Sequence, residues 1–73
     1  MAASFLLYGS TGFVGRAMAS MALERGLPLI VAGRDAMKVH IQAAQLGVEG
    51  RSFSLDDPAA MDRALAGVAV VLH

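Results

Sequence analysis

Three glycines at a regular spacing constrain this chain more than any other feature. Gly9, Gly12 and Gly15 lie in the run Gly-Ser-Thr-Gly-Phe-Val-Gly, directly after the apolar segment Ser4–Tyr8. That segment is short and ends abruptly at a glycine, which is typical of a strand buried on both faces. Because the residues after the run have helical spacing, the pattern predicts a glycine turn that joins a strand to a helix.

The helix predicted after the glycine run is amphipathic. Its apolar positions recur at steps of three and four residues, as expected for one helical face, and Gly26 is a natural stop. This predicted face consists of Val14, Ala17, Met18, Met21, Ala22 and Arg25, with Arg16, Ser20 and Glu24 on the other side.

The rest of the chain repeats the alternation of strand and helix. The expected strands are residues 27–32, 51–55 and 68–72. One expected helix runs from the N-cap Asp35 to Leu46 and ends at Gly47, and another starts at Asp57-Pro58 and ends before Gly67. Their apolar positions are Val39, Ala43 and Leu46 in the former, and Met61, Ala64 and Leu65 in the latter. The sequence therefore predicts an α/β fold, a three-layer Rossmann-type unit with a four-stranded parallel sheet in the order 3-2-1-4 and three helices.

Length and composition narrow the possible functions. The 73 residues allow a single domain, and we expect residues 1–73 to be a truncated one, because doubly wound domains continue with further strands. A net charge of zero gives no drive toward nucleic acid or anionic membranes. With no cysteine and two histidines we expect no metal site, and without a signal peptide or a long apolar run we expect a soluble, cytoplasmic protein.

The glycine run is suited to a dinucleotide pyrophosphate. Gly9 makes the tight turn, Gly12 removes a side chain where the pyrophosphate approaches, and Gly15 lets the helix lie close to the strand. Free N–H groups at the helix start then face the anion. The alternative is that the glycines serve only the turn and the packing. The hydroxyls of Ser10 and Thr11 could bind phosphate or satisfy backbone groups, and both alternatives stay open.

The end of the second strand bears on which nucleotide binds. In NAD-binding domains an acid near this place binds the ribose 2′-hydroxyl, whereas here the sequence reads Gly33-Arg34-Asp35. Arg34 suits a 2′-phosphate, which favours NADP. Asp35 is expected to cap a helix, and its alternative role as a ribose ligand would imply NAD instead.

Other polar residues are weaker candidates. Asp56 is expected at the end of the third strand, where it could accept from the adenine amino group or be only a solvated acid, and both alternatives stay open. Asp57 is expected to be a cap. His40 and His73 are given no catalytic role, and no other catalytic residue is assigned in this chain.

Several of these motifs together resemble a known family. The runs Leu-Leu-Tyr-Gly-Ser-Thr-Gly-Phe-Val-Gly-Arg, Ile-Val-Ala-Gly-Arg-Asp with Lys38, and Leu-Asp-Asp-Pro look like the N-terminal NADP-binding domain of saccharopine dehydrogenase-like proteins. The glycine run alone is shared with extended and atypical short-chain dehydrogenases. The resemblance implies a 2′-phosphate contact at Arg34 and an adenine contact at Asp56. It also implies pyrophosphate contacts at Ser10, Thr11, Gly12, Phe13 and Val14.

We therefore expect the NADP-binding portion of an oxidoreductase whose catalytic part lies outside these residues. The alternative is a non-catalytic module that senses NADP, of the atypical short-chain dehydrogenase type. The expected partner is the dinucleotide cofactor. The apolar edge strand 68–72 further predicts a homodimer or a larger homo-oligomer.

Overall fold

The computed structural model describes residues 4–65 and 68–72, and it has the predicted alternation of strands and helices. The elements are β1 (Ser4–Tyr8), α1 (Phe13–Glu24), β2 (Leu29–Gly33), α2 (Ala36–Leu46), β3 (Glu49–Ser52), α3 (Pro58–Ala64) and β4 (Val68–Leu72). This is a Rossmann-like α/β unit with parallel strands and three helices. Gly67 and His73 lie outside the described residues.

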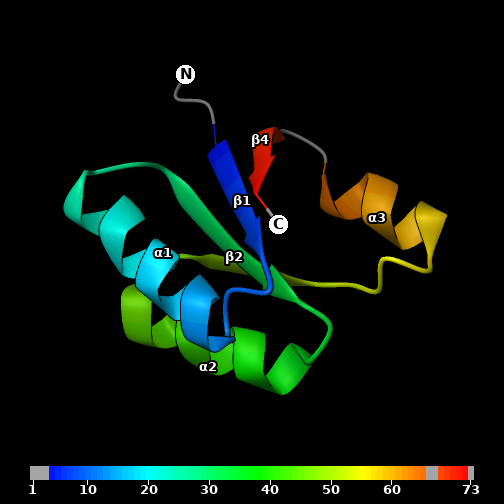
Figure 1. The fold of residues 1–73 in the computed structure, drawn as a ribbon. Helices are drawn as coiled ribbons and strands as arrows, with labels where there is room; N and C mark the ends of the chain where they lie inside the picture. Colours follow the sequence, from blue (N-terminus) through cyan, green and yellow to red (C-terminus); the bar gives the residue numbers. More distant parts are fainter. Residues whose placement is uncertain (1–3, 66–67, 73) are drawn as a thin grey trace.

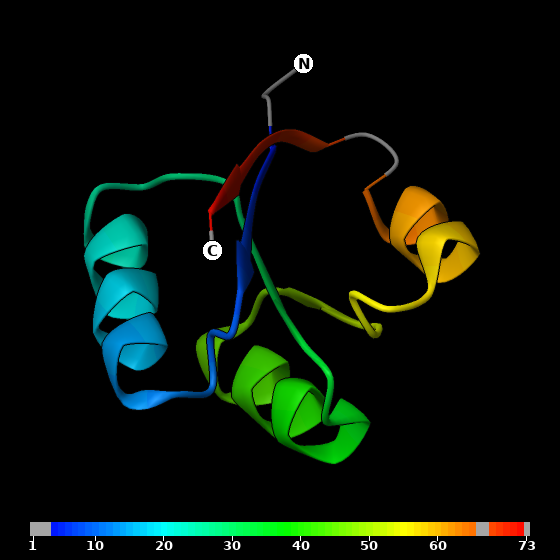
Figure 2. The ribbon, with the colours of Figure 1, turned by 45° about the vertical axis from the view of Figure 1, so that its right-hand side comes forward.

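The strands form one parallel sheet with β1 inside it. The strand order is β3-β2-β1-β4, and the register of β1 pairs Leu6 with Ile30 of β2 and with Val71 of β4. Figure 1 shows α1 and α2 on one face of this sheet and α3 on the other, and the turned view in Figure 2 keeps the same three layers. The carboxyl ends of β1 and β2 therefore lie side by side, next to the start of α1.

Each face of the sheet carries its own apolar core. Alternate side chains of a strand point to opposite faces, so neighbouring residues of β1 and β2 contribute to different cores. The core under α1 and α2 contains Leu7, Ala19, Leu29, Val31, Val39 and Ala43. The core under α3 contains Leu6, Ile30, Ala32 and Phe53, with Met61, Ala64 and Leu65 partly buried against it. The sheet is thus packed against helices on both of its faces.

The buried face of α1 differs from the predicted one. Ala19 is buried, with Ala22 and Leu23 partly buried beside it, whereas Met18 and Met21 are exposed. Small residues face the sheet because the helix lies very close to it at its start. The larger apolar residues form a second face of α1, and helical spacing alone did not distinguish these two faces.

The boundaries of two strands also differ from the prediction. β3 comprises Glu49–Ser52 rather than residues 51–55, and β2 starts at Leu29 rather than at residue 27. β3 is an edge strand whose polar residues pair with β2, Glu49 opposite Ile30, and the backbone N–H of Phe53 donates to Gly33 O at 3.0 Å. Pairing with the buried strand β2 therefore places β3 at residues whose β-propensity is low.

Within the described residues, no helix is long and apolar enough to cross a membrane.

Candidate nucleotide-binding site

The turn after β1 is tied to the end of β2. Gly9 has φ = +80°, a conformation that favours glycine, and its N–H donates to the carbonyl oxygen of Ala32 at 2.9 Å. The N–H of Ser10 donates to the same oxygen at 3.2 Å. The glycine turn is therefore anchored at the point where the two central strands end.

Gly15 allows α1 to start against this turn. A β-carbon at Gly15 would lie 2.1 Å from the carbonyl oxygen of Gly9 and 2.7 Å from the Cα of Ser10. Both are backbone atoms that cannot rotate away. The close approach of helix and strand expected at Gly15 is thus present in the structure.

The first turn of α1 has unused hydrogen-bond donors. Gly12 is its N-cap residue and provides no side-chain cap, and the N–H of Arg16 makes the first helical bond, to Gly12 O at 2.9 Å. By contrast, Asp35 caps α2 and Asp57 caps α3, each through a carboxylate oxygen that accepts from a backbone N–H at 3.1 Å. The helix that begins at the glycine run is left open to an anion, since its first N–H groups need acceptors from outside the helix.

Gly12 is exposed and its backbone is ordinary. With φ = −75° it requires no glycine, and a β-carbon there would lie 3.4 Å from Gly9 O, which is van der Waals contact. Packing therefore does not explain this glycine. An external group that approaches the backbone here would explain it.

The two hydroxyl residues of the run are placed differently. Ser10 is fully buried, and its hydroxyl lies 2.7 Å from Gln42 Oε1 and 3.2 Å from Ala32 O. Its side chain is therefore engaged inside the protein, with groups that are distant in sequence rather than with the local backbone of the turn. Thr11 is half-buried and lines a cavity that a ligand could enter.

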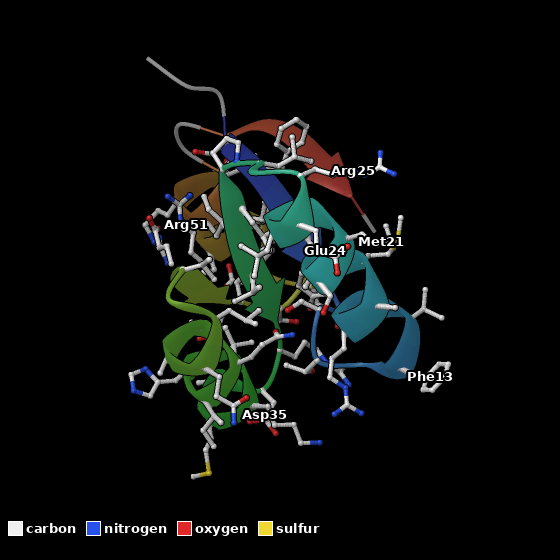
Figure 3. The ribbon with its side chains drawn as sticks, turned by 90° about the vertical axis from the view of Figure 1, so that its left-hand side faces the viewer. Phe13, Met21, Glu24, Arg25, Asp35 and Arg51 are labelled. Carbon is white, nitrogen blue, oxygen red and sulfur yellow. The ribbon has the colours of Figure 1, made fainter. Side chains whose placement is uncertain are left out.

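Phe13 and Val14 present their side chains to solvent. Phe13 is 87% exposed and Val14 is 66% exposed. Figure 3 shows the Phe13 ring extending outward from the start of α1, away from the sheet. Contacts of these residues with a pyrophosphate would thus come from their backbone N–H groups.

At the end of β2, the capping role of Asp35 is confirmed, because its carboxylate accepts from the N–H of Lys38. Arg34 is exposed, and its guanidinium has no hydrogen-bond or ion-pair partner within residues 4–65 and 68–72. Gly33 is buried, and a β-carbon there would lie 3.3 Å from Cγ2 of Val39. Little space for a side chain exists at Gly33, and Arg34 is the first residue after β2 that is free to reach a ligand.

Asp56 does not lie at the end of a strand. β3 ends at Ser52, so Asp56 falls in the exposed turn before α3, where its N–H donates to Ser54 Oγ at 3.1 Å. The expectation of a strand-end position was wrong, because β3 lies earlier in the chain than predicted.

Cavities flank the start of α1 on both sides. One, of about 330 Å³, is lined by Thr11, Arg16 and Lys38 among others, between α1 and α2. Another, of about 350 Å³, is lined by Gly9, Val14 and residues of β1 and α1 on the side toward β4. An elongated ligand that crosses the helix start would fill both.

The cavity between α1 and α2 is positively charged. Arg16 and Lys38 line it, whereas no acidic residue does, and neither side chain has an ion-pair partner in the described part of the chain. The surroundings therefore fit an anionic group beside the glycine run. Among the described residues no group of side chains is arranged to hold a metal ion.

Gln42 is a polar residue at this site that was not predicted from the sequence. This residue of α2 is only 8% exposed and bonds to Ser10 through both atoms of its amide. Its position between Val39 and Ala43 on the helix face was the available signal, since a polar residue on a buried face needs a partner.

Comparisons with known proteins agree with this geometry. Residues 5–73 match the model of the NAD dependent epimerase/dehydratase family. A nucleoside-diphosphate-sugar epimerase from Pseudomonas aeruginosa is similar in structure, with a TM-score of 0.82 and 27% identity over 97% of this chain and 23% of its own. The 3-hydroxyacyl-CoA dehydrogenase type-2 from Mycobacterium avium has a TM-score of 0.73 and 26% identity over 99% of this chain and 32% of its own.

This chain thus spans less than a third of the length of either protein. No protein of curated function matches it in sequence. The family found is not the saccharopine dehydrogenase-like family that the motifs resembled, and that narrower assignment is not supported. The glycine run is common to both kinds of protein, so by itself it could not distinguish one family from the other.

Proposed function

Since the chain belongs to the NAD dependent epimerase/dehydratase family, we propose that it binds NADP and forms the cofactor-binding portion of an enzyme that transfers hydride. The observation that carries this proposal is the uncapped start of α1 beside a cavity lined by Arg16 and Lys38. The pyrophosphate would bind the backbone N–H groups of Thr11, Phe13, Val14 and Gly15, with Gly12 giving it access to the backbone. When bound, the nicotinamide ring supplies the hydride chemistry.

NADP is favoured over NAD by the charges around the end of β2. Asp35, the acid nearest to the place of a ribose ligand, is engaged as the cap of α2. Arg34 beside it has no ion-pair partner among the residues that the structure describes, and a guanidinium suits a phosphate dianion. Lys38 one turn into α2 adds a second positive charge, so a 2′-phosphate has more partners here than a 2′-hydroxyl.

We propose a minor role for Asp56, as an acceptor for the adenine amino group. The turn that holds it follows β3, at the same edge of the sheet as Arg34. Asp56 is exposed, and within the described residues its carboxylate has no hydrogen-bond or ion-pair partner, so it is available to accept from the base.

The decisive experiment is a parallel titration of NADPH and NADH by calorimetry. We expect NADPH to bind more tightly. In Arg34→Ala this preference should fall about tenfold to a hundredfold, because a hydrogen bond to a charged group is worth roughly 1.5–3 kcal/mol. Arg25→Ala is the matched control, since Arg25 is also exposed but lies at the other end of α1 from Phe13 (Figure 3).

The alternatives give different results. Tighter binding of NADH would make NAD the cofactor, and binding of neither would leave the fold without the proposed activity. A non-catalytic NADP-sensing module remains the alternative function. In the full-length protein it would bind NADPH but show no hydride transfer to or from any substrate, whereas an enzyme would oxidise or reduce the bound cofactor during turnover.

A further inference from the structure

Ser10 and Gln42 form a buried polar pair directly under the glycine run. Ser10 is 0% exposed and Gln42 is 8% exposed. The Ser10 hydroxyl donates toward Gln42 Oε1 at 2.7 Å, and Gln42 Nε2 donates to the carbonyl oxygen of Ser10 at 2.8 Å. The pair thus joins α2 to the turn after β1, across 32 residues of sequence.

The bond to the Ser10 carbonyl controls a peptide plane. This carbonyl and the N–H of Thr11 belong to the same peptide, which is trans, so the two groups point in opposite directions. When Gln42 holds the carbonyl toward α2, the N–H of Thr11 points away from Gln42. Within the described residues this N–H has no hydrogen-bond acceptor.

We propose that Gln42 is a positioning residue for the nucleotide, which orients the Ser10–Thr11 peptide so that the Thr11 N–H is presented to the pyrophosphate. This inference rests on the proposed function. A buried amide that makes both of its bonds is retained at a cost in desolvation, and an apolar side chain would fill the same space. The Gln42 amide fixes the orientation of the Ser10–Thr11 peptide. An apolar side chain at this position could not bond to the Ser10 carbonyl.

The test compares two ligands of the 73-residue chain. NADPH contains the pyrophosphate, whereas adenosine 2′-monophosphate carries only the adenosine and the 2′-phosphate. In Gln42→Met we expect the affinity for NADPH to fall about tenfold, the equivalent of one lost hydrogen bond to a charged group. The affinity for adenosine 2′-monophosphate should change by less than about twofold, because this ligand has no pyrophosphate to accept from the Thr11 N–H.

His40→Met is the matched control, because His40 is exposed on the same helix. It should leave both affinities unchanged. If Gln42→Met does not fold by circular dichroism, Gln42→Asn is used in its place, since its amide is one methylene too short to reach Ser10. An equal loss of affinity for both ligands, or no loss of affinity for either, would overturn the positioning role.

A second readout requires no ligand. The N–H of Gly12 donates to Gly9 O at 3.1 Å, so its hydrogen exchange by NMR reports on the turn. In the Gln42 variant we expect exchange at Gly12 to accelerate about tenfold while amides in the middle of α2 keep their rates. Unchanged exchange at Gly12 would overturn the inference. If the unmodified chain binds neither nucleotide, the proposed function fails, and this measurement alone decides whether Gln42 holds the turn.

Discussion

Gly15 lies so close to Gly9 that a β-carbon on Gly15 would be 2.1 Å from the carbonyl oxygen of Gly9. The contact sets the distance between the start of α1 and the turn after β1. At Gly12, three residues earlier, a β-carbon would be tolerated at 3.4 Å from the same oxygen. Packing therefore requires a glycine at position 15 but not at position 12, and we propose that Gly12 gives a ligand access to the backbone.

This difference predicts opposite effects of the same substitution. Gly15→Ala should destabilise the fold by about 1–3 kcal/mol or more, as overpacked sites do, and a domain this small has little stability to lose. Gly12→Ala should keep the free energy of unfolding within about 1 kcal/mol but weaken the binding of NADPH. Urea unfolding followed by circular dichroism measures the former, and calorimetry the latter. A stable Gly15→Ala variant would contradict the packing role.

The cavity between α1 and α2 predicts a specific charge effect. Arg16→Gln and Lys38→Gln each remove one cation from its lining, so each should weaken NADPH binding more than NADH binding, because NADPH carries the additional 2′-phosphate. Partly exposed charge pairs are worth roughly 0.2–1 kcal/mol and are screened by salt. The loss should therefore shrink at high ionic strength. Arg63→Gln, on α3 at the other face of the sheet, serves as the control, and equal losses for both dinucleotides would place the cavity outside the 2′-phosphate site.

The cap of α2 predicts how Asp35 responds to substitution. Asp35→Ala should cost about 1 kcal/mol of unfolding free energy, because the N–H of Lys38 loses its acceptor. Asp35→Asn should retain most of the stability, since the amide oxygen caps equally well. The NADPH affinity of the Asn variant, measured by calorimetry, should stay near that of the unmodified chain. A large change in NADH affinity would mean instead that this carboxylate reaches the ribose.

The unpartnered apolar surface predicts self-association. Met18 and Met21 line a cavity of about 200 Å³ together with Phe5 and Leu7 of β1, and β4 is an edge strand of the sheet. Figure 3 shows Met21 pointing outward from α1. We expect a homodimer or larger assembly in sedimentation velocity, and Met21→Glu should shift it toward monomer by placing a charge on the apolar face. A monomer at high micromolar concentration would contradict this expectation.

Several local features of the candidate site could be predicted from the sequence. Gly9, Gly12 and Gly15 are recognisable by their spacing after a strand, and the capping roles of Asp35 and Asp57 by the helices they precede. Asp56 could not be placed in the same way, because its position depends on where β3 ends. That end is decided by pairing with β2.

The role of Gln42 could not be predicted from its own segment of the sequence. Its partner Ser10 is 32 residues away, and no local pattern connects them. The family could not be predicted from one motif either, because several families share the glycine run. Only comparison over residues 5–73 distinguished them.

The sequence by itself determined the order of the elements, the glycine turn and the helix caps, because each depends on the backbone preferences of a few neighbouring residues. Tertiary structure alone decided which face of α1 is buried, where β3 begins, and that Gln42 lies under the glycine run. Those features arise when the sheet brings distant segments together, and their free energy comes from packing and hydrogen bonds between segments rather than within them.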